Sequence, residues 1–115
     1  MFPQPKKWSV TSYRTTRGEL PVEQFTHALD ANTYAKTLRM VELLERYGPQ
    51  LRPPYSKKIK KDLYELRIKG KVEVRIIYTF LNGIFHLLHA FKKKGQKIPL
   101  REIKLAEFRL ATLID

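Results

Sequence analysis

Two apolar runs lie in the middle of the chain, and an Asn-Gly pair separates them. The runs are residues 72–81 and 84–91, and Asn82-Gly83 joins them. Asparagine and glycine both tolerate the positive φ angles of a type I′ turn, so this pair predicts a β-hairpin with a two-residue loop. Such a loop places Leu81 opposite Ile84. Every other cross-strand pair of the predicted hairpin then follows by counting away from the turn.

This register gives the hairpin one apolar side and one polar side, because side chains alternate along a strand. The predicted pairs on the apolar side are Phe80–Phe85, Tyr78–Leu87, Ile76–His89 and Val74–Phe91. The predicted pairs on the polar side are Thr79–His86, Ile77–Leu88, Arg75–Ala90 and Glu73–Lys92.

A further strand precedes this hairpin, and a three-residue loop over Lys69-Gly70-Lys71 keeps the apolar residues of the two strands together. It predicts the pairs Ile68–Val72, Leu66–Val74 and Tyr64–Ile76 on the apolar side, with Arg67–Glu73 and Glu65–Arg75 on the polar side. We therefore expect one sheet face to be covered by helices and the other to be exposed. The expected exposed face carries Glu65, Arg67, Glu73, Arg75, His86 and Lys92, with Lys93 and Lys94 close by.

The remaining segments predict one more strand and three helices. Residues 8–13 alternate like a short strand rich in β formers. Pro21 begins an amphipathic helix, and a second helix runs from about Thr33 to Tyr47, where Gly48 and Pro49 end it. Pro99 begins an amphipathic helix that continues to the end of the chain. The expected fold is a single α+β domain over 1–115, with two N-terminal helices packed on a mainly antiparallel four-stranded sheet and a C-terminal helix.

The charge is strongly positive and unevenly distributed. The formal net charge is +12. Residues 57–115 hold 15 Lys and Arg against 6 acids, whereas residues 1–56 hold 8 against 5. RNA, DNA, an acidic protein or an anionic membrane surface are therefore candidate ligands, and the alternative is a charge surplus that only keeps the protein soluble.

A lysine run leads into the predicted sheet. Residues 51–56 contain two adjacent prolines, which exclude a helix or a central strand. The run that follows is either a solvated charged segment or an arm that contacts phosphate. Its cationic members are Lys57, Lys58, Lys60 and Lys61.

The sequence lacks the residues that several classes of chemistry require. It has no cysteine, its three histidines are scattered, and no paired carboxylates or glycine-rich phosphate loop occur, so we expect neither a metal nor a cofactor. No apolar run is long enough for a membrane span, and the first residues have no apolar leader core, so we expect a cytoplasmic protein.

Cations on the predicted exposed face suggest phosphodiester chemistry. Arg67, Arg75 and Lys92, with Lys93, Lys94 and Lys97 at the edge, could stabilise the negative charge of a phosphorane. In RNA the 2′-OH supplies the nucleophile. A protein has only to align this hydroxyl with the adjacent phosphorus, remove its proton and neutralise the charge that develops on the phosphate. The alternative is that the two arginines merely pair with Glu73 and Glu65 across the strands. His89 and Tyr78 fall on the apolar side and are interpreted as core residues.

The order of several motifs resembles a known toxin family. The series comprises Gly48, Leu51, Pro53 or Pro54, Lys57, LYELR, VRIIY, LLHAFKKKGQKIP and EIKLAEFR, preceded by Trp8-Ser9-Val10, Pro21-Val22 and Phe25. Over nearly the whole chain this series is similar to the phage-derived HigB branch of the RelE/ParE toxin superfamily.

The resemblance implies a RelE-like α+β fold and the toxin of a type II toxin–antitoxin system. It implies a metal-independent endoribonuclease that cuts messenger RNA on the ribosome, and a HigA-like helix-turn-helix antitoxin that neutralises it in a toxin–antitoxin complex. Alternatives are a ParE-like gyrase inhibitor without enzymatic activity, or a basic nucleic-acid-binding module without catalysis.

The resemblance also assigns site residues. Arg67 and Arg75 match positions that contact phosphate, and Lys92 and Lys93 match a basic pair after the last strand. Lys57, Lys58, Lys60, Lys61, Lys94 and Lys97 are the remaining candidates for RNA binding. The chain departs from many relatives in having GQKIPL where a tyrosine is expected and ATLID where some have a histidine and an acid. The general base is therefore left open between Lys94, Lys97 and a group of the ribosome.

Overall fold

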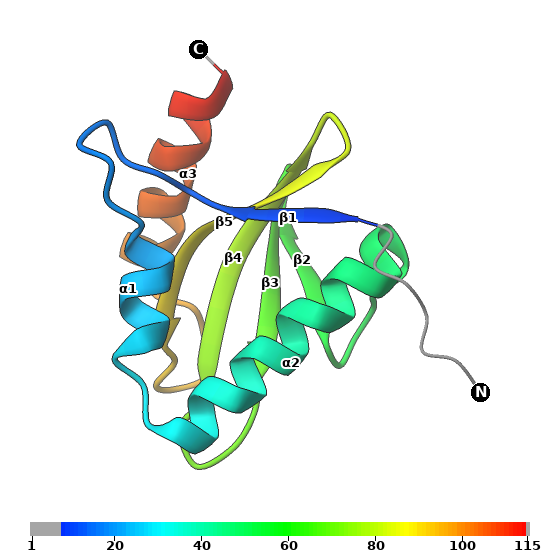
Figure 1. The fold of residues 1–115 in the computed structure, drawn as a ribbon, viewed down its shortest axis with the longest axis vertical. Helices are drawn as coiled ribbons and strands as arrows, with labels where there is room; N and C mark the ends of the chain where they lie inside the picture. Colours follow the sequence, from blue (N-terminus) through cyan, green and yellow to red (C-terminus); the bar gives the residue numbers. More distant parts are fainter. Residues whose placement is uncertain (1–7, 115) are drawn as a thin grey trace.

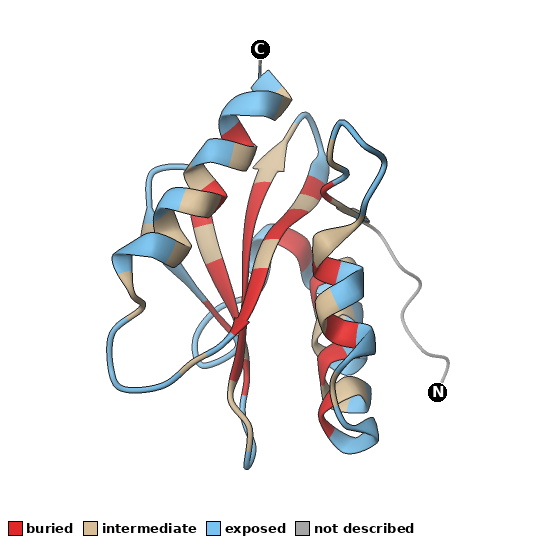
Figure 2. Cartoon of the chain, turned by 90° about the vertical axis from the view of Figure 1, so that its left-hand side faces the viewer, coloured by how far each residue is buried: buried red, intermediate tan, exposed pale blue. Residues whose placement is uncertain are grey.

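A computed structural model describes residues 8–114, which form three layers with the β-sheet in the middle (Figures 1 and 2). Helices α1 and α2 cover one face of the sheet, and α3 covers part of the other. The elements are β1 (Ser9–Ser12), α1 (Pro21–His27), α2 (Ala31–Tyr47), the 3-10 turn η1 (Gly48–Gln50), β2 (Ser56–Lys60), β3 (Leu63–Ile68), β4 (Val74–Leu81), β5 (Ile84–Lys92) and α3 (Leu100–Ile114). The α+β class and the three expected helices are confirmed, while Asp115 lies outside the described residues.

The described sheet has five strands rather than the expected four, in the order β1-β5-β4-β3-β2. The additional strand is β2, which pairs antiparallel with β3 and forms one edge. Part of the lysine run is therefore edge strand, and lysines at such an edge discourage pairing with other chains. At the opposite edge, β1 pairs parallel with β5. The sheet is thus mixed, with one parallel pair.

The β4–β5 hairpin has the predicted turn. Asn82 and Gly83 take φ angles of 50° and 80°. The pairs from Leu81–Ile84 to Tyr78–Leu87 are confirmed. Beyond them the register shifts, because β5 contains an extra residue opposite the junction of Ile77 and Tyr78.

This β-bulge overturns the rest of the predicted register. The pairs Ile77–Leu88, Ile76–His89, Arg75–Ala90, Val74–Phe91 and Glu73–Lys92 were wrong. The structure pairs Ile77 with His89, Ile76 with Ala90, Arg75 with Phe91 and Val74 with Lys92. A shift of one residue moves every later side chain to the other face of the sheet. His89 and Phe91 therefore lie on the α3 side, and Lys92 lies on the side of α1 and α2.

The β3–β4 hairpin differs from the prediction by two residues. Its loop spans residues 69–73, and the pairs are Ile68–Val74, Arg67–Arg75, Leu66–Ile76, Glu65–Ile77 and Tyr64–Tyr78. The predicted three-residue loop was therefore wrong, as were the partners that it assigned. Because a slip of two residues keeps each side chain on its face, Glu65, Arg67 and Arg75 still share one side of the sheet.

Each face of the sheet has its own hydrophobic core (Figure 2). The larger core, under α1 and α2, contains Val22, Leu44, Leu66, Ile68, Val74, Ile76, Tyr78, Phe85, Leu87 and Ala90. The smaller core, under α3, contains Tyr13, Leu63, Ile77, Leu88, Phe91, Ala106 and Leu110. The face that the sequence predicted to be exposed is thus partly covered by α3. Tyr78 is a core residue as predicted, and its hydroxyl is 2.6 Å from that of Ser56.

Both ends of α2 follow from local chemistry. Asp30 caps the N-terminus, where its carboxylate accepts hydrogen bonds from the backbone N–H and the hydroxyl of Thr33. Gly48 ends the helix with a φ of 53°. A Cβ atom at Gly48 would lie 2.5 Å from the indole of Trp8, so glycine is required there for space as well as for conformation.

The cap predicts acid sensitivity of the fold. Hydrogen bonds from Thr33, its side chain first, lower the pKa of Asp30 from its usual 3.8. A carboxyl group with a lowered pKa in the folded state stabilises the fold above its unfolded pKa, and this contribution disappears as the pH falls through the folded pKa. We expect Asp30→Asn to lower the thermal midpoint at pH 7 and the difference from wild type to vanish toward pH 2. Thermal denaturation over this range checks this, and a constant difference would contradict it.

Candidate active site

Four charged side chains meet at the hairpin end of β3 and β4, on the α3 side of the sheet. We call Glu65, Arg67, Glu73 and Arg75 the arginine cluster. Arg67 and Arg75 are directly opposite one another, and Glu65 lies one pair farther along the same face. The sequence predicted this grouping because strand alternation places Glu65, Arg67 and Arg75 on one face. It did not predict that the two arginines would be neighbours.

Arg75 is the buried member of the arginine cluster, with a side chain only 5% exposed. Its Nε donates to Oε1 of Glu65 at 3.0 Å, and its Nη2 donates to Oε1 of Glu73 at 3.3 Å. Its Nη1 donates to the carbonyl of Val74 at 3.2 Å. All three nitrogens are therefore bonded within the protein. The prediction that Arg75 lies on an open face was wrong, and Arg75 is suited to holding the cluster together.

Arg67 is the accessible member, with a side chain 23% exposed. Its Nε donates to Oε1 of Glu65 at 3.1 Å. Its two terminal nitrogens make no hydrogen bond to the described residues. One edge of the guanidinium is thus fixed by Glu65 while the other is free to bind an anion. A planar guanidinium of this kind matches two oxygens of a phosphate group.

Lys92 does not join this cluster. It pairs with Val74, whose side chain is in the core under α1 and α2, so Lys92 emerges on the opposite face. The backbone of Lys93 borders the cluster, since its N–H donates to the carbonyl of Glu73 at 2.8 Å. The Nζ of Lys93 donates to the carbonyl of Gly95, which fixes the start of the loop leading to α3.

The other predicted lysines are dispersed. Lys57 is exposed on β2 directly opposite Glu65, whereas Lys58 is opposite Tyr64 and faces the other side of the sheet. Lys60 forms an ion pair with Glu107 of α3 at 2.7 Å. Of this group, Lys57 alone stands beside the arginine cluster. Lys61 is exposed in the β2–β3 turn, and Lys94 and Lys97 are exposed in the loop between β5 and α3.

His89 lies on the same face and docks α3 onto the sheet. Its Nε2 is 2.7 Å from Oε1 of Glu102, and its Nδ1 is 3.5 Å from Nη1 of Arg109. The ring of His89 stacks on Phe91, which pairs with Arg75. Sequence reasoning placed His89 in the other core and missed this contact. The seven-residue spacing of Glu102 and Arg109, two helical turns, was the available signal.

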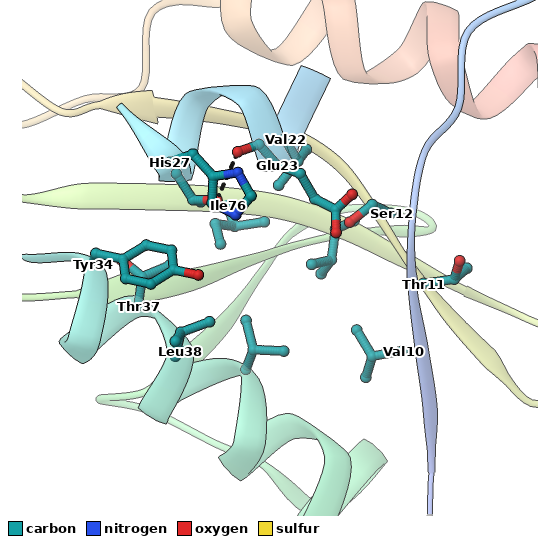
Figure 3. Close-up of a pocket in the computed structure, with 13 residues that line it drawn as sticks. Val10, Thr11, Ser12, Val22, Glu23, His27, Tyr34, Thr37, Leu38 and Ile76 are labelled. Carbon is teal, nitrogen blue, oxygen red and sulfur yellow. Dashed lines mark hydrogen bonds between the residues drawn. The ribbon is translucent and has the colours of Figure 1, made fainter. Parts of the chain in front are cut away.

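Figure 3 shows a pocket on the opposite side of the sheet, between α1, α2 and β1. It has a volume of about 200 Å³, and Glu23, His27 and Tyr34 contribute polar groups. Neither lysine nor arginine lines it, so it is poorly suited to a polyanion. His86 also lies away from the arginine cluster, opposite Thr79, and burial lowers the pKa of its imidazole.

A groove along α2 combines an apolar floor with a cationic rim. Its volume is about 360 Å³, and Met40, Leu43, Pro54, Tyr55 and Ile68 form the floor. The charged residues at its rim are Lys36, Arg39 and Lys69. The groove therefore has the apolar surface and the charge to receive an acidic, amphipathic protein segment.

Within residues 8–114 no group of three or more histidine, cysteine or acidic side chains is placed to hold a metal ion. In the same range, no helix has the length and apolar character needed to cross a membrane. The arginine cluster offers a guanidinium whose terminal nitrogens are free to bind an anion, a carboxylate fixed beside it, and a buried arginine that holds this carboxylate.

The comparisons with known proteins give one family. The family described as "Phage derived protein Gp49-like (DUF891)" matches residues 24–111, which include both arginines, His89 and most of α3. No curated protein matches the chain.

Proposed function

Because this chain belongs to the Gp49-like family of phage-derived proteins, a family associated with the toxins of toxin–antitoxin systems, we propose that it is a HigB-type toxin that cleaves messenger RNA. The arginine cluster is the observation that supports cleavage. A guanidinium with free terminal nitrogens is held in a fixed position on a rigid sheet, and this is the arrangement that stabilises charge developing on a phosphate.

In the proposed reaction the RNA provides its own nucleophile. Arg67 binds two oxygens of the scissile phosphate. Arg75 fixes the position of Glu65, which in turn orients Arg67. Lys93 and Lys57 flank the cluster and contribute to the positive potential that holds the backbone. Attack of the 2′-oxygen on phosphorus yields a 2′,3′-cyclic phosphate and a free 5′-hydroxyl. No metal ion takes part in this proposal.

The proposed substrate is messenger RNA on the ribosome, and the proposed partner is a HigA-like helix-turn-helix antitoxin. The family association supports an antitoxin partner. The groove along α2 supports a partner segment that is acidic and amphipathic, because each charged residue lining it is cationic. The protein would act in the cytoplasm, where the ribosomes are.

Induction of the protein in growing cells tests this function. We expect growth arrest, together with new messenger RNA ends on ribosomes that carry the 5′-hydroxyl of 2′-OH attack. Co-expression of the helix-turn-helix protein encoded by the neighbouring reading frame should restore both growth and intact messages.

Two outcomes contradict the proposal. Growth arrest with intact messages and inhibited DNA supercoiling by purified gyrase would indicate a ParE-like inhibitor. Growth without any defect would indicate a basic nucleic-acid-binding module.

A further inference from the structure

A carboxylate in the arginine cluster has one oxygen fixed and the other free. Oε1 of Glu65 accepts hydrogen bonds from Nε of Arg67 at 3.1 Å and from Nε of Arg75 at 3.0 Å. Oε2 makes no hydrogen bond to the described residues, and it is not among their buried unpaired atoms, so it reaches solvent. The side chain as a whole is 9% exposed. Glu65 is therefore a rigidly oriented carboxylate with one oxygen, Oε2, available to accept a hydrogen bond.

From this geometry we infer that Glu65 is the general base that takes the proton from the 2′-OH of RNA. The inference rests on the proposed function, since it concerns the same reaction. A base must stand beside the phosphate-binding group and must have an acceptor oxygen that no other group occupies. Glu65 meets both requirements, because the guanidinium of Arg67 contacts it along one edge and offers its other nitrogens to the phosphate.

The other candidates near the cluster are less suitable. Glu73 is 44% exposed in the loop before β4, and among the described residues its carboxylate bonds to Arg75 and not to Arg67. His89 has Nε2 engaged by Glu102 and Nδ1 facing Arg109. Lys94 and Lys97 are exposed in the loop after β5, and neither side chain forms a hydrogen bond or ion pair with the cluster in the part of the chain that the structure describes. Glu65 is left as the base, with a role that the sequence did not assign.

The step balances without an external reagent other than water. The 2′-O–H bond breaks and its proton passes to Oε2 of Glu65, while the 2′-oxygen forms a bond to phosphorus. The bond between phosphorus and the 5′-oxygen then breaks, and water protonates the leaving 5′-oxygen. Glu65 returns its proton to solvent. The charged groups that face Glu65 are Lys57 from β2, Arg67 on its own strand and Arg75 from β4.

The variant Glu65→Gln tests this role, because glutamine retains the shape and one acceptor oxygen but removes the base. On programmed ribosomes we expect the single-turnover cleavage rate at pH 7 to fall about 100-fold. Affinity for ribosomes whose message carries a 2′-deoxy residue at the cut site should change less than threefold. The pH profile should also change in form. The cleavage rate of wild type should not change between pH 6 and 8.5. The cleavage rate of the variant should rise about tenfold per pH unit, because hydroxide replaces the base.

Two further variants make the result decisive. Glu65→Asp keeps a carboxylate and should retain a level profile at a reduced rate. Glu107→Gln removes a carboxylate from an ion pair on α3, away from the cluster, and should match wild type in rate and profile. A Glu65→Gln protein with unchanged rate, or with a reduced but level profile, would overturn the role of Glu65 alone. Wild-type protein that leaves messages intact would overturn the proposed function and the base together.

Discussion

Replacing Arg67 by alanine is expected to abolish toxicity while leaving the protein folded. The terminal nitrogens of Arg67 are its free donors, and a single preorganised donor to a developing anion contributes about 100- to 1,000-fold in rate. The fold should survive because the side chain is partly exposed and Arg75 continues to neutralise Glu65. Cleavage of ribosome-bound message in vitro and growth after induction measure the effect, and circular dichroism checks the fold.

Two control variants separate charge from geometry at this site. Arg67→Lys keeps the positive charge but loses the planar fork of donors, so it should recover only part of the activity. Arg101→Ala removes one positive charge from a side chain that is 79% exposed on α3, and it should remain toxic. If Arg67→Ala arrests growth as strongly as wild type, the phosphate is held by other residues.

Replacing Arg75 by alanine is expected to lower the free energy of unfolding by about 3 kcal/mol. Its guanidinium is buried and bonds to Glu65, Glu73 and the carbonyl of Val74, and breaking a buried ion pair from one side costs about 3–5 kcal/mol. The lower end applies because Arg67 remains to pair with Glu65. Because Arg75 is buried, we expect this substitution to reduce stability and toxicity together.

Urea denaturation of Arg75→Ala and wild type measures this difference. The matched control is again Arg101→Ala, whose exposed ion pair should contribute less than about 1 kcal/mol. Arg75→Met fills most of the vacated volume and should recover part of the stability without restoring cleavage, since it cannot orient Glu65. An Arg75→Ala protein that unfolds within 0.5 kcal/mol of wild type, where about 3 is expected, would show that this ion pair is not a structural contact.

The interior of β5 shows where sequence reasoning fails. Residues 84–91 are almost continuously apolar, and a run without alternation does not specify which side chains face which side. In the structure, the β-bulge directs Leu87 and Ala90 to the core under α1 and α2, while Leu88 and Phe91 face the core under α3. Both faces of this strand are covered, so the bulge satisfies two cores at once. The position of Lys92 depended on this packing.

The sequence by itself determined the features that depend on neighbouring residues. The Asn82-Gly83 turn, the C-terminal end of α2 and the shared face of Glu65, Arg67 and Arg75 all follow from backbone preference and strand alternation. Tertiary structure decided the features that depend on distant segments. These are the pairing of β1 with β5, the edge position of β2, the β-bulge, and the covering of the charged face by α3. The physical reason is that strand alternation determines which side chains share a face of the sheet, but not which strands pair. Only packing against a helix distant in the sequence decides which face is buried.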